Sequence, residues 1–427
     1  MLSNYPRLGE KLFFSTLPNG LRLCVLPRPG FTKKLAYFVT DFGSIHTSFL
    51  LDGQAVRAPM GVAHFLEHKL FDMPEGDVSQ PLAQLGAAVN AFTTYDMTAY
   101  YFSCTDHFEK CLELLVRFVI TPYFTDESVA KEQGIIGQEI DMDQDVAESR
   151  VFENLMEAMY QNHRIREPVL GDRASIARIT PQVLHQSHRA FYRPENMMLC
   201  VLADADPEVI LSQVQQLTQG WENPQVSLIP TPSERSLPPS HMVESYMDVS
   251  APLFQLGFKC RDIGEGEEAA RQEFIAELAS EVLFGESSDL YLKLYEQGLI
   301  DGSFAGGFET VRGAALLTAS GESPDPKAVR DAILERAGEL ANTGIDPETF
   351  QRLRRSAMGR RLRSLDSFDA TCFRLCAYRL TGFDYFRFPE IYETLTPEDI
   401  RQFIRQAVTE ENACLSVIYP KEEKTIC

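Results

Sequence analysis

The chain has 427 residues, of which 44% are apolar and 24% are charged, and this composition excludes collagen-like, coiled-coil and wholly disordered proteins. A formal net charge of −21 repels a phosphate backbone, so we expect no nucleic-acid partner. No apolar run reaches the roughly 20 residues of a membrane span, and the N-terminal residues resemble neither a signal peptide nor a presequence. Nine cysteines form no CxxC pair. Together these features predict a cytoplasmic protein without membrane attachment, whose thiols are reduced and mostly buried.

The first half of the chain predicts a mixture of strands and helices. Strands are predicted where apolar, β-branched and aromatic residues concentrate, at 21–26, 35–41 and 98–104. Helices are predicted where apolar residues follow helical spacing, at 61–71, 107–119, 127–161 and 181–191. A segment with five prolines between Trp221 and Val243 has the composition of a connector. We therefore predict an N-terminal domain at 1–222, a linker at 223–240 and a C-terminal domain at 241–427.

The second half repeats this plan. Its predicted strands are 253–260 and 314–319, and its predicted helices are 267–284, 326–342, 347–377 and 397–408. Both halves close with Thr-Pro, a helix, an Asn at the same separation and an apolar alternation, starting at Thr180 and Thr396. The matching ends predict an internal duplication. The expected fold is α+β, with two homologous domains, each a mainly antiparallel sheet with helices packed on one face.

The segment GVAHFLEHKLF, residues 61–71, contains the candidate metal-binding and catalytic residues. His64 and His68 stand four residues apart, so a helix places both imidazoles on one face as a chelating pair. Zinc binds neutral imidazole readily, and Glu67 beside the pair is suited to take a proton from a water molecule. The alternative is a helix whose histidines are partly buried and satisfied by hydrogen bonds.

A third ligand should come from another helix, since a catalytic zinc site uses three protein ligands. Glu132 and Glu139 lie seven residues apart, two helical turns along one face. Glu139 is the candidate ligand, and Glu132 is suited to accept a hydrogen bond from a ligating histidine. Taken alone, two acids on a helix are more often a solvated face.

HxxEH followed by this glutamate helix resembles the inverzincins of the pitrilysin/insulinase metallopeptidase family. Three further segments, 83–102, 162–180 and 191–204, resemble the same family. The resemblance implies that His64, His68 and Glu139 bind one Zn²⁺ per chain. It also implies that Glu67 is the general base and Glu132 the auxiliary acid.

The resemblance further implies a zinc metalloendopeptidase that hydrolyses short or unfolded peptides. In that family, two units of about 400 residues close like a clamshell around a chamber. The peptide would add as a strand beside residues Val89, Asn90, Ala91, Phe92 and Thr93.

Two departures from the family pattern affect the expected activity. Alignment of the halves puts Glu277 and Glu281 where the first half has its histidines, so no zinc is expected there. Active members also contribute an Arg and a Tyr to bind substrate, but the matching positions here hold Tyr295 and Asp301. We therefore expect a heterodimer in which a homologous subunit lacking HxxEH supplies this pair, although a homodimer stays open. The alternative function is a non-catalytic scaffold or assembly subunit.

Two other groups of polar residues are less specific. A basic stretch at 352–363 predicts a salt-bridged, solvated face, or else a docking face for an acidic partner. His163, His185 and His188 form no helical pair with a carboxylate, so structural or surface roles are expected for them.

Overall fold

The computed structural model describes residues 2–421, which form two compact units. Unit 1 combines residues 2–140, 168–230 and 362–386, and unit 2 combines residues 141–167, 231–361 and 387–421. Each unit therefore takes most of its residues from one half of the chain and one short stretch from the other. The domain boundaries predicted at residues 222 and 240 divide the sequence into two halves and are not the boundaries of these units. They remain a prediction.

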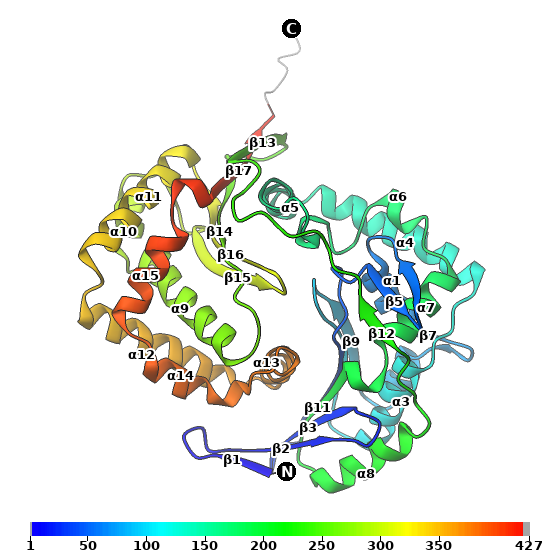
Figure 1. The fold of residues 1–427 in the computed structure, drawn as a ribbon. Coiled ribbons are helices and arrows are strands. Elements are labelled where there is room, and N and C mark those ends of the chain that lie inside the picture. Colours follow the sequence, from blue (N-terminus) through cyan, green and yellow to red (C-terminus); the bar gives the residue numbers. More distant parts are fainter. Residues whose placement is uncertain (1, 422–427) are drawn as a thin grey trace. The chain divides into compact units, whose positions relative to one another are not determined.

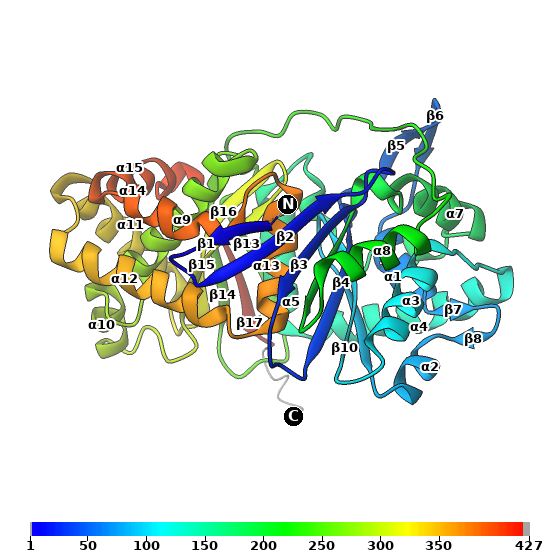
Figure 2. The ribbon, with the colours of Figure 1, turned by 90° about the horizontal axis from the view of Figure 1, so that it is seen from below.

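Unit 1 is built on a seven-stranded sheet, part of which is seen in Figure 2. Its strands in spatial order are β1 (Leu2–Tyr5), β2 (Glu10–Thr16), β3 (Arg22–Pro27), β11 (Met197–Ala203), β4 (Lys34–Thr40), β10 (Thr98–Cys104) and β9 (Ala88–Thr93). Only the β3–β11 pair is parallel. Every residue of β11 is buried, because both faces of this central strand are covered, and this explains its continuous apolar sequence MMLCVLA.

Helices of the first half cover one face of this sheet, with α1, α3 and α8 in contact with its strands. The helices of unit 1 are α1 (Val62–Lys69), α2 (Ser79–Gln84), α3 (Phe108–Ile120), α4 (Asp126–Gln144), α6 (Arg173–Ile176), α7 (Pro181–Phe191), α8 (Pro207–Leu217) and α13 (Phe368–Leu380). Two small sheets complete the unit, formed by β5 (Ser48–Leu51), β6 (Gln54–Arg57) and β12 (Val226–Leu228), and by β7 (Asp72–Met73) and β8 (Gly76–Asp77). The core between sheet and helices holds alternate strand residues such as Phe38, Tyr100 and Leu199.

Unit 2 is built on a five-stranded sheet. Its strands in spatial order are β13 (Met242–Met247), β17 (Ala413–Pro420), β14 (Leu253–Cys260), β16 (Ala314–Glu322) and β15 (Ala305–Val311). Its helices are α5 (Ala147–Met159), α9 (Gly266–Phe284), α10 (Asp289–Glu296), α11 (Pro326–Thr343), α12 (Pro347–Ser364), α14 (Phe388–Thr394) and α15 (Pro397–Ala407). Short 3₁₀ turns occur in both units, at Arg164–Arg166, Pro194–Asn196, Tyr385–Arg387 and Glu410–Asn412.

The two sheets repeat one topology. The order β3-β11-β4-β10-β9 in unit 1 matches β13-β17-β14-β16-β15 in unit 2, and in each case the first pair is parallel while the others are antiparallel. Each half also ends with a helix capped by Thr180 or Thr396, whose side chain accepts a backbone N–H, and a following central strand. The predicted fold class, with two homologous α+β domains, is confirmed.

Two predicted helices were wrong in length, in the same way in both halves. The predicted helix at 127–161 is broken between α4 and α5, and the predicted helix at 347–377 is broken between α12 and α13. Ser367 caps α13, and Val146 before α5 has extended backbone, so each second helix starts afresh. After each break the chain leaves its own half: α5 belongs to unit 2 and α13 to unit 1.

The exchanged helices cover the sheet faces that the other helices leave open. In unit 2, α5 contacts β13, β14 and β17, and a Cβ at Gly257 would lie 2.5 Å from the Met159 sulfur. On the opposite face, a Cβ at Gly306 would clash with Phe284 of α9. Figure 1 shows α5 on one side of this sheet and α9, α11 and α15 on the other, and likewise α13 opposite α1 and α3 in unit 1.

Eight cysteines lie among the described residues, and none forms a disulfide. Seven are buried and Cys260 is half-buried, while Cys427 lies outside the described residues. Between residues 2 and 421, no helix is both long and apolar enough to cross a bilayer.

Candidate metal centre

The helix that contains the HxxEH motif is held at its first turn by two glycines. Gly61, before α1, has a left-handed backbone with φ of 82°, and a Cβ there would lie 2.4 Å from the Leu170 carbonyl oxygen. Gly171 also has positive φ, and a Cβ there would lie 2.8 Å from the Met60 carbonyl oxygen. Both positions require glycine. The segment 168–171 therefore sets where α1 begins.

Three of the predicted site residues converge. His64 and His68 project from one face of α1, with ring centroids 4.6 Å apart. The Nε2 atoms of His64 and His68 each lie 3.7 Å from an oxygen of Glu139 on α4. One ligand atom from each of the three residues falls within 4.8 Å of the others, and this is the only such group among the residues the structure describes.

Glu132 and Glu139 lie on opposite sides of the His68 ring. The Nδ1 atom of His68 is 3.0 Å from Oε1 of Glu132, while its Nε2 atom faces Glu139. The spacing of two helical turns thus lets one helix reach both ring nitrogens. A Cβ at Gly137 of α4 would lie 2.6 Å from the Arg173 guanidinium, so this helix is fixed by the same segment that follows Gly171.

Burial and a neighbouring charge keep the imidazole of His64 neutral. Burial, followed by the charge of His68, lowers the pKa of His64 to about 3. Burial also lowers the pKa of His68, but the hydrogen bond and charge of Glu132 and the charges of Glu67 and Glu139 outweigh it and raise the pKa. In the metal-free protein, the carboxylates therefore attract a positive charge at the position of His68.

Glu67 lies on the same helix and contacts the sheet. Thr93 Oγ1, at the end of β9, donates a 2.6 Å hydrogen bond to Glu67 Oε2. Burial raises the pKa of Glu67, although the Thr93 hydrogen bond and the charge of His68 oppose this shift. A carboxylate with a raised pKa beside a polar site is suited to accept and return a proton.

The donor set fits zinc. Two imidazole nitrogens and one carboxylate are the ligands of many catalytic zinc sites, and His64 remains neutral with its lone pair available. Tetrahedral zinc with bonds of 2.0–2.1 Å separates its ligands by about 3.3 Å, close to the 3.7 Å between Glu139 and each imidazole. Glu132 supplies the carboxylate that zinc-binding histidines usually contact through their second nitrogen.

The contacts of two residues near this site were not predicted. Thr93 was proposed only as part of the substrate strand, and its contact with Glu67 depends on how β9 packs against α1. Lys69 directly follows the motif and is fully buried, at 0% exposure. Its ammonium contacts Asp72 and lies 4.0 Å from Glu132 Oε2. Sequence offered no signal for this burial, because lysine is almost always exposed.

The predicted substrate strand β9 is an edge strand, paired only with β10. Because the Thr94 N–H donates to Met97 O across this pair, the odd-numbered residues direct their N–H groups away from β10. The Ala91 N–H instead donates to the Asn90 side-chain oxygen at 2.8 Å. The edge therefore presents backbone groups to which another strand could pair.

In the part of unit 2 that the structure describes, the corresponding region holds no such donor set. Glu277 accepts hydrogen bonds of 2.8 Å from Arg361 and 2.6 Å from Tyr392. Glu281 accepts a 2.6 Å hydrogen bond from Arg360. Arginines of α12 thus occupy the place that carboxylates of α4 have in unit 1.

The basic stretch on α12 is therefore partly internal rather than wholly solvated. Arg361 is 7% exposed, and its guanidinium lies over the Phe274 ring at 4.1 Å. The predicted salt bridges of this stretch are confirmed at Arg360 and Arg361. The positions expected for the substrate-binding pair differ from the family: Tyr295 stacks on Tyr291, and Asp301 accepts hydrogen bonds from Ser303.

The histidines outside the motif have other surroundings. His188 donates to the Val119 carbonyl oxygen, and His163 donates to that of Arg312.

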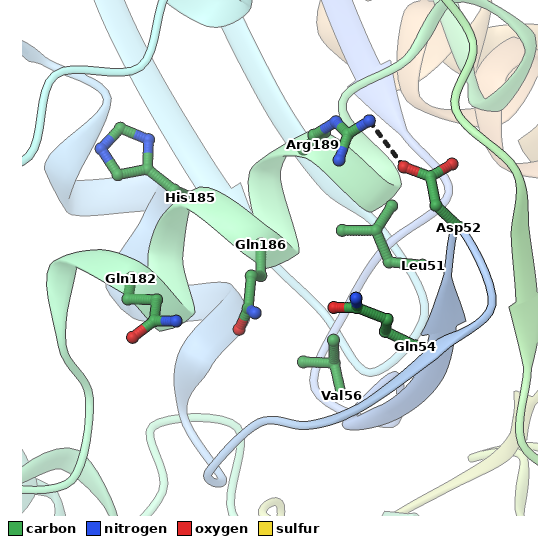
Figure 3. A pocket seen from close by; sticks show the side chains of 8 residues that line it. All are labelled: Leu51, Asp52, Gln54, Val56, Gln182, His185, Gln186 and Arg189. Carbon is green, nitrogen blue, oxygen red and sulfur yellow. Dashed lines mark ion pairs between the residues drawn. The ribbon is translucent and has the colours of Figure 1, made fainter.

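His185 is exposed and lines a surface pocket of about 590 Å³ between the β5–β6 hairpin and α7. Figure 3 shows its polar wall, where Arg189 pairs with Asp52 at 2.6 Å. The pocket contains no residue of the HxxEH helix, so the chemistry of the motif does not occur there.

Comparisons with known proteins show which family and fold the chain resembles. Residues 55–173 match the family model for insulinase, peptidase family M16, and residues 178–357 match the model for the peptidase M16 inactive domain. The chain is 35% identical to the zinc protease YmfH of Bacillus subtilis (strain 168), over 98% of both proteins. An M16-like peptidase structure from Alicyclobacillus acidocaldarius matches with a TM-score of 0.93 and 32% identity, over 96% of this chain and 99% of that one. A protease from Helicobacter pylori shares the fold, with a TM-score of 0.82 at 16% identity, over 96% of this chain and 100% of that one.

Proposed function

The chain belongs to peptidase family M16, and we propose that it is a zinc-dependent endopeptidase subunit that hydrolyses short or unfolded peptides. In this proposal His64, His68 and Glu139 hold one Zn²⁺ per chain, and Glu67 is the general base. The observation that carries the proposal is the convergence of ligand atoms from His64, His68 and Glu139 within 4.8 Å. The Glu67 carboxylate lies on α1, the helix that also contains both histidines.

When bound, zinc polarises a carbonyl group and lowers the pKa of water. The residues of the chain supply the rest of the reaction. Glu67 takes the proton of the attacking water and returns it to the leaving amine. Thr93 holds the Glu67 carboxylate through its 2.6 Å hydrogen bond, and Glu132 orients the His68 ring through Nδ1.

We propose that the substrate pairs with β9 as an added strand, beside Val89 to Thr93. Its position at the sheet edge and the outward direction of alternate N–H groups support this mode. Because Thr93 ends β9 and contacts Glu67, a peptide paired along this strand would pass next to the proton acceptor. Release of the Ala91 N–H from the Asn90 side chain would make one more donor available to that peptide.

The absent Arg/Tyr pair supports a heterodimer. Tyr295 and Asp301 provide no guanidinium at the expected place, and loss of one donor to a developing oxyanion costs about 3 kcal/mol. We propose that a homologous subunit without HxxEH supplies the pair across a closed, clamshell chamber. Cytoplasmic localisation stays a prediction from the sequence. The same absence is what favours the second candidate, a non-catalytic scaffold subunit.

The test measures zinc content and peptide cleavage of the purified chain and of the Glu67→Gln variant. We expect about one zinc per chain in both proteins, because Glu67 is not a proposed ligand. Cleavage of fluorogenic peptides should fall by roughly 10²–10⁴-fold in the variant, as expected for loss of a general base. Glu281→Gln, the same change on the corresponding helix of unit 2, should leave cleavage unchanged.

Four outcomes would each contradict part of the proposal. An apo protein, or a variant that cleaves like the wild type, would exclude the zinc mechanism with Glu67. Zinc retention without cleavage, even together with a subunit copurified from the native source, would favour the scaffold. Full cleavage by the single chain as a homodimer would refute the heterodimer alone.

A further inference from the structure

Lys69, the last residue of α1, is buried beside the candidate metal centre. It is 0% exposed, and its ammonium has two carboxylates as neighbours, Asp72 in direct contact and Glu132 Oε2 at 4.0 Å. A buried ammonium is costly unless it is paired. None of the metal chemistry proposed above uses Lys69, so its burial at this place requires another explanation.

Glu132 connects Lys69 to the candidate ligand His68. One carboxylate oxygen of Glu132, Oε1, lies 3.0 Å from His68 Nδ1, and the other, Oε2, faces Lys69. The side chain of Glu132 is only 13% exposed, so water contributes little to its orientation. With an imidazole on one oxygen and an ammonium near the other, the carboxylate has a fixed direction.

The orientation of Glu132 determines the orientation of the His68 ring. Because Nδ1 faces Glu132, Nε2 is directed towards Glu139. If Glu132 were free to rotate, the ring would lose the contact that aims its second nitrogen. Asp72 neutralises the ammonium, so Lys69 can hold Glu132 without adding net positive charge near a bound cation.

We propose that Lys69 is a positioning residue for the metal centre, which fixes Glu132 and through it the direction of the His68 ring. This inference rests on the proposed function for the identity of the metal. It adds a residue outside the HxxEH motif, and it predicts that a side chain that touches neither metal nor substrate controls metal affinity.

The test measures the Zn²⁺ dissociation constant of the full chain by competition with a chromogenic chelator. Lys69→Met should weaken zinc binding by about 10–100-fold, the effect typical of residues that support a metal ligand. Lys131→Met removes a positive charge from the exposed neighbour of Glu132 on α4, and it should change the constant less than about twofold.

A double-mutant cycle separates positioning from general destabilisation. If Lys69 acts through Glu132, adding Lys69→Met to Glu132→Gln should weaken zinc binding by less than about threefold more. Should Lys69→Met fail to fold, the pair Lys69→Met/Asp72→Asn removes the buried charge together with its partner, and it should show the same 10–100-fold loss. Zinc binding like that of the wild type in these variants, or fully additive losses in the cycle, would overturn the proposal.

A measurement without metal distinguishes this inference from the proposed function. In the zinc-free protein with ¹⁵N-labelled histidine, the His68 Nδ1 signal should report a hydrogen bond that is lost in Lys69→Met and kept in Lys131→Met. If the wild type bound no zinc, the proposed function would fail while this signal still tested Lys69. An unchanged signal in Lys69→Met would refute the role of Lys69 even in a zinc-binding protein.

Discussion

The two units place opposite charges at corresponding positions of one repeated architecture. In unit 1, α1 presents the imidazoles of His64 and His68 to the carboxylates of α4. In unit 2, α9 presents the carboxylates of Glu277 and Glu281 to the guanidinium groups of α12. The first arrangement places carboxylates beside imidazoles and favours a bound cation, whereas the second supplies its own cations.

This difference explains why, among the described residues, only one unit of a duplicated fold brings together a donor set suited to a metal ion. Strand order and helix placement repeat in both units, so the fold alone does not create the site. The site arises from the residue types at a few positions on two helices. In unit 2 the same positions form a partly buried ion-pair network, which we expect to act on stability and not on zinc.

The largest expected effect comes from removing a proposed ligand in unit 1. His68→Asn should weaken zinc binding by about 100–1,000-fold, because structural sites with four ligands gain about 10–16 kcal/mol in total, or roughly 2.5–4 kcal/mol per ligand. His185→Asn, an exposed histidine of the same unit, is the matched control and should bind zinc normally. Metal content after dialysis and the zinc dissociation constant from chelator competition are measured for both variants. Zinc retained by the His68 variant would show that the proposed site of unit 1 does not bind the metal.

The next effect tests the network of unit 2. Arg361→Met leaves Glu277 with the Tyr392 hydroxyl and Arg360 nearby, and losing a hydrogen bond to a charged group typically costs about 1.5–3 kcal/mol. Urea unfolding should show this loss, while zinc content stays at the wild-type level. Arg363→Met, at an exposed position of the same helix, should change the unfolding free energy by less than about 0.5 kcal/mol. Zinc loss in Arg361→Met would mean that the two regions are not independent.

A third effect depends on pH. Burial raises the pKa of Glu234, but hydrogen bonds from Lys259 and from the backbone amides of residues 161–163 outweigh it and lower the pKa to about 2. In the folded protein the pKa of Glu234 lies below its usual value of 4.5. The stabilisation from its hydrogen bonds is therefore fully present above pH 4.5 and is lost as the pH falls towards 2.

Glu234→Gln should therefore lower the free energy of unfolding by about 1–3 kcal/mol at pH 7. The difference in unfolding free energy between the variant and the wild type should become smaller as the pH falls from 5 to 3. Urea unfolding over this range measures it, with the exposed Glu222→Gln as control. A difference that stays constant or widens at low pH would contradict the assigned cause.

The smallest effect concerns the contact between β9 and the proposed base. Thr93→Val removes the hydrogen bond to Glu67, which is worth about 1.5 kcal/mol for a charged acceptor. We expect about a tenfold loss in kcat/KM with unchanged zinc content. Thr310→Val on the exposed edge strand of unit 2 should have no effect on either quantity. An unaffected Thr93 variant would show that Glu67 does not depend on this contact.

Sequence was sufficient for the local part of the site. The His64 and His68 pair follows from helical spacing alone, and the Glu132 and Glu139 spacing predicted one helix face. The repeated strand plan was also visible, because turn and cap residues recur at matching offsets near Thr180 and Thr396. These features depend on residues close together in the chain.

What sequence missed depends on contacts between distant segments. The breaks before α5 and α13 are short, and a continuous helix accounts for the same apolar spacing, so the exchange of helices between units was not predicted. Lys69 looks like an ordinary exposed lysine until Asp72 and Glu132 are placed around it. The same is true of Arg361, whose burial against Phe274 follows only from the packing of α12 on α9.

One measurement tests the central claim most directly, namely anomalous scattering at the zinc edge from crystals of the full chain. We predict a single peak per chain, bounded by His64, His68 and Glu139, and no peak near Glu277 and Glu281. The absence of a peak between the two imidazoles, or a peak of equal height in unit 2, would contradict the account.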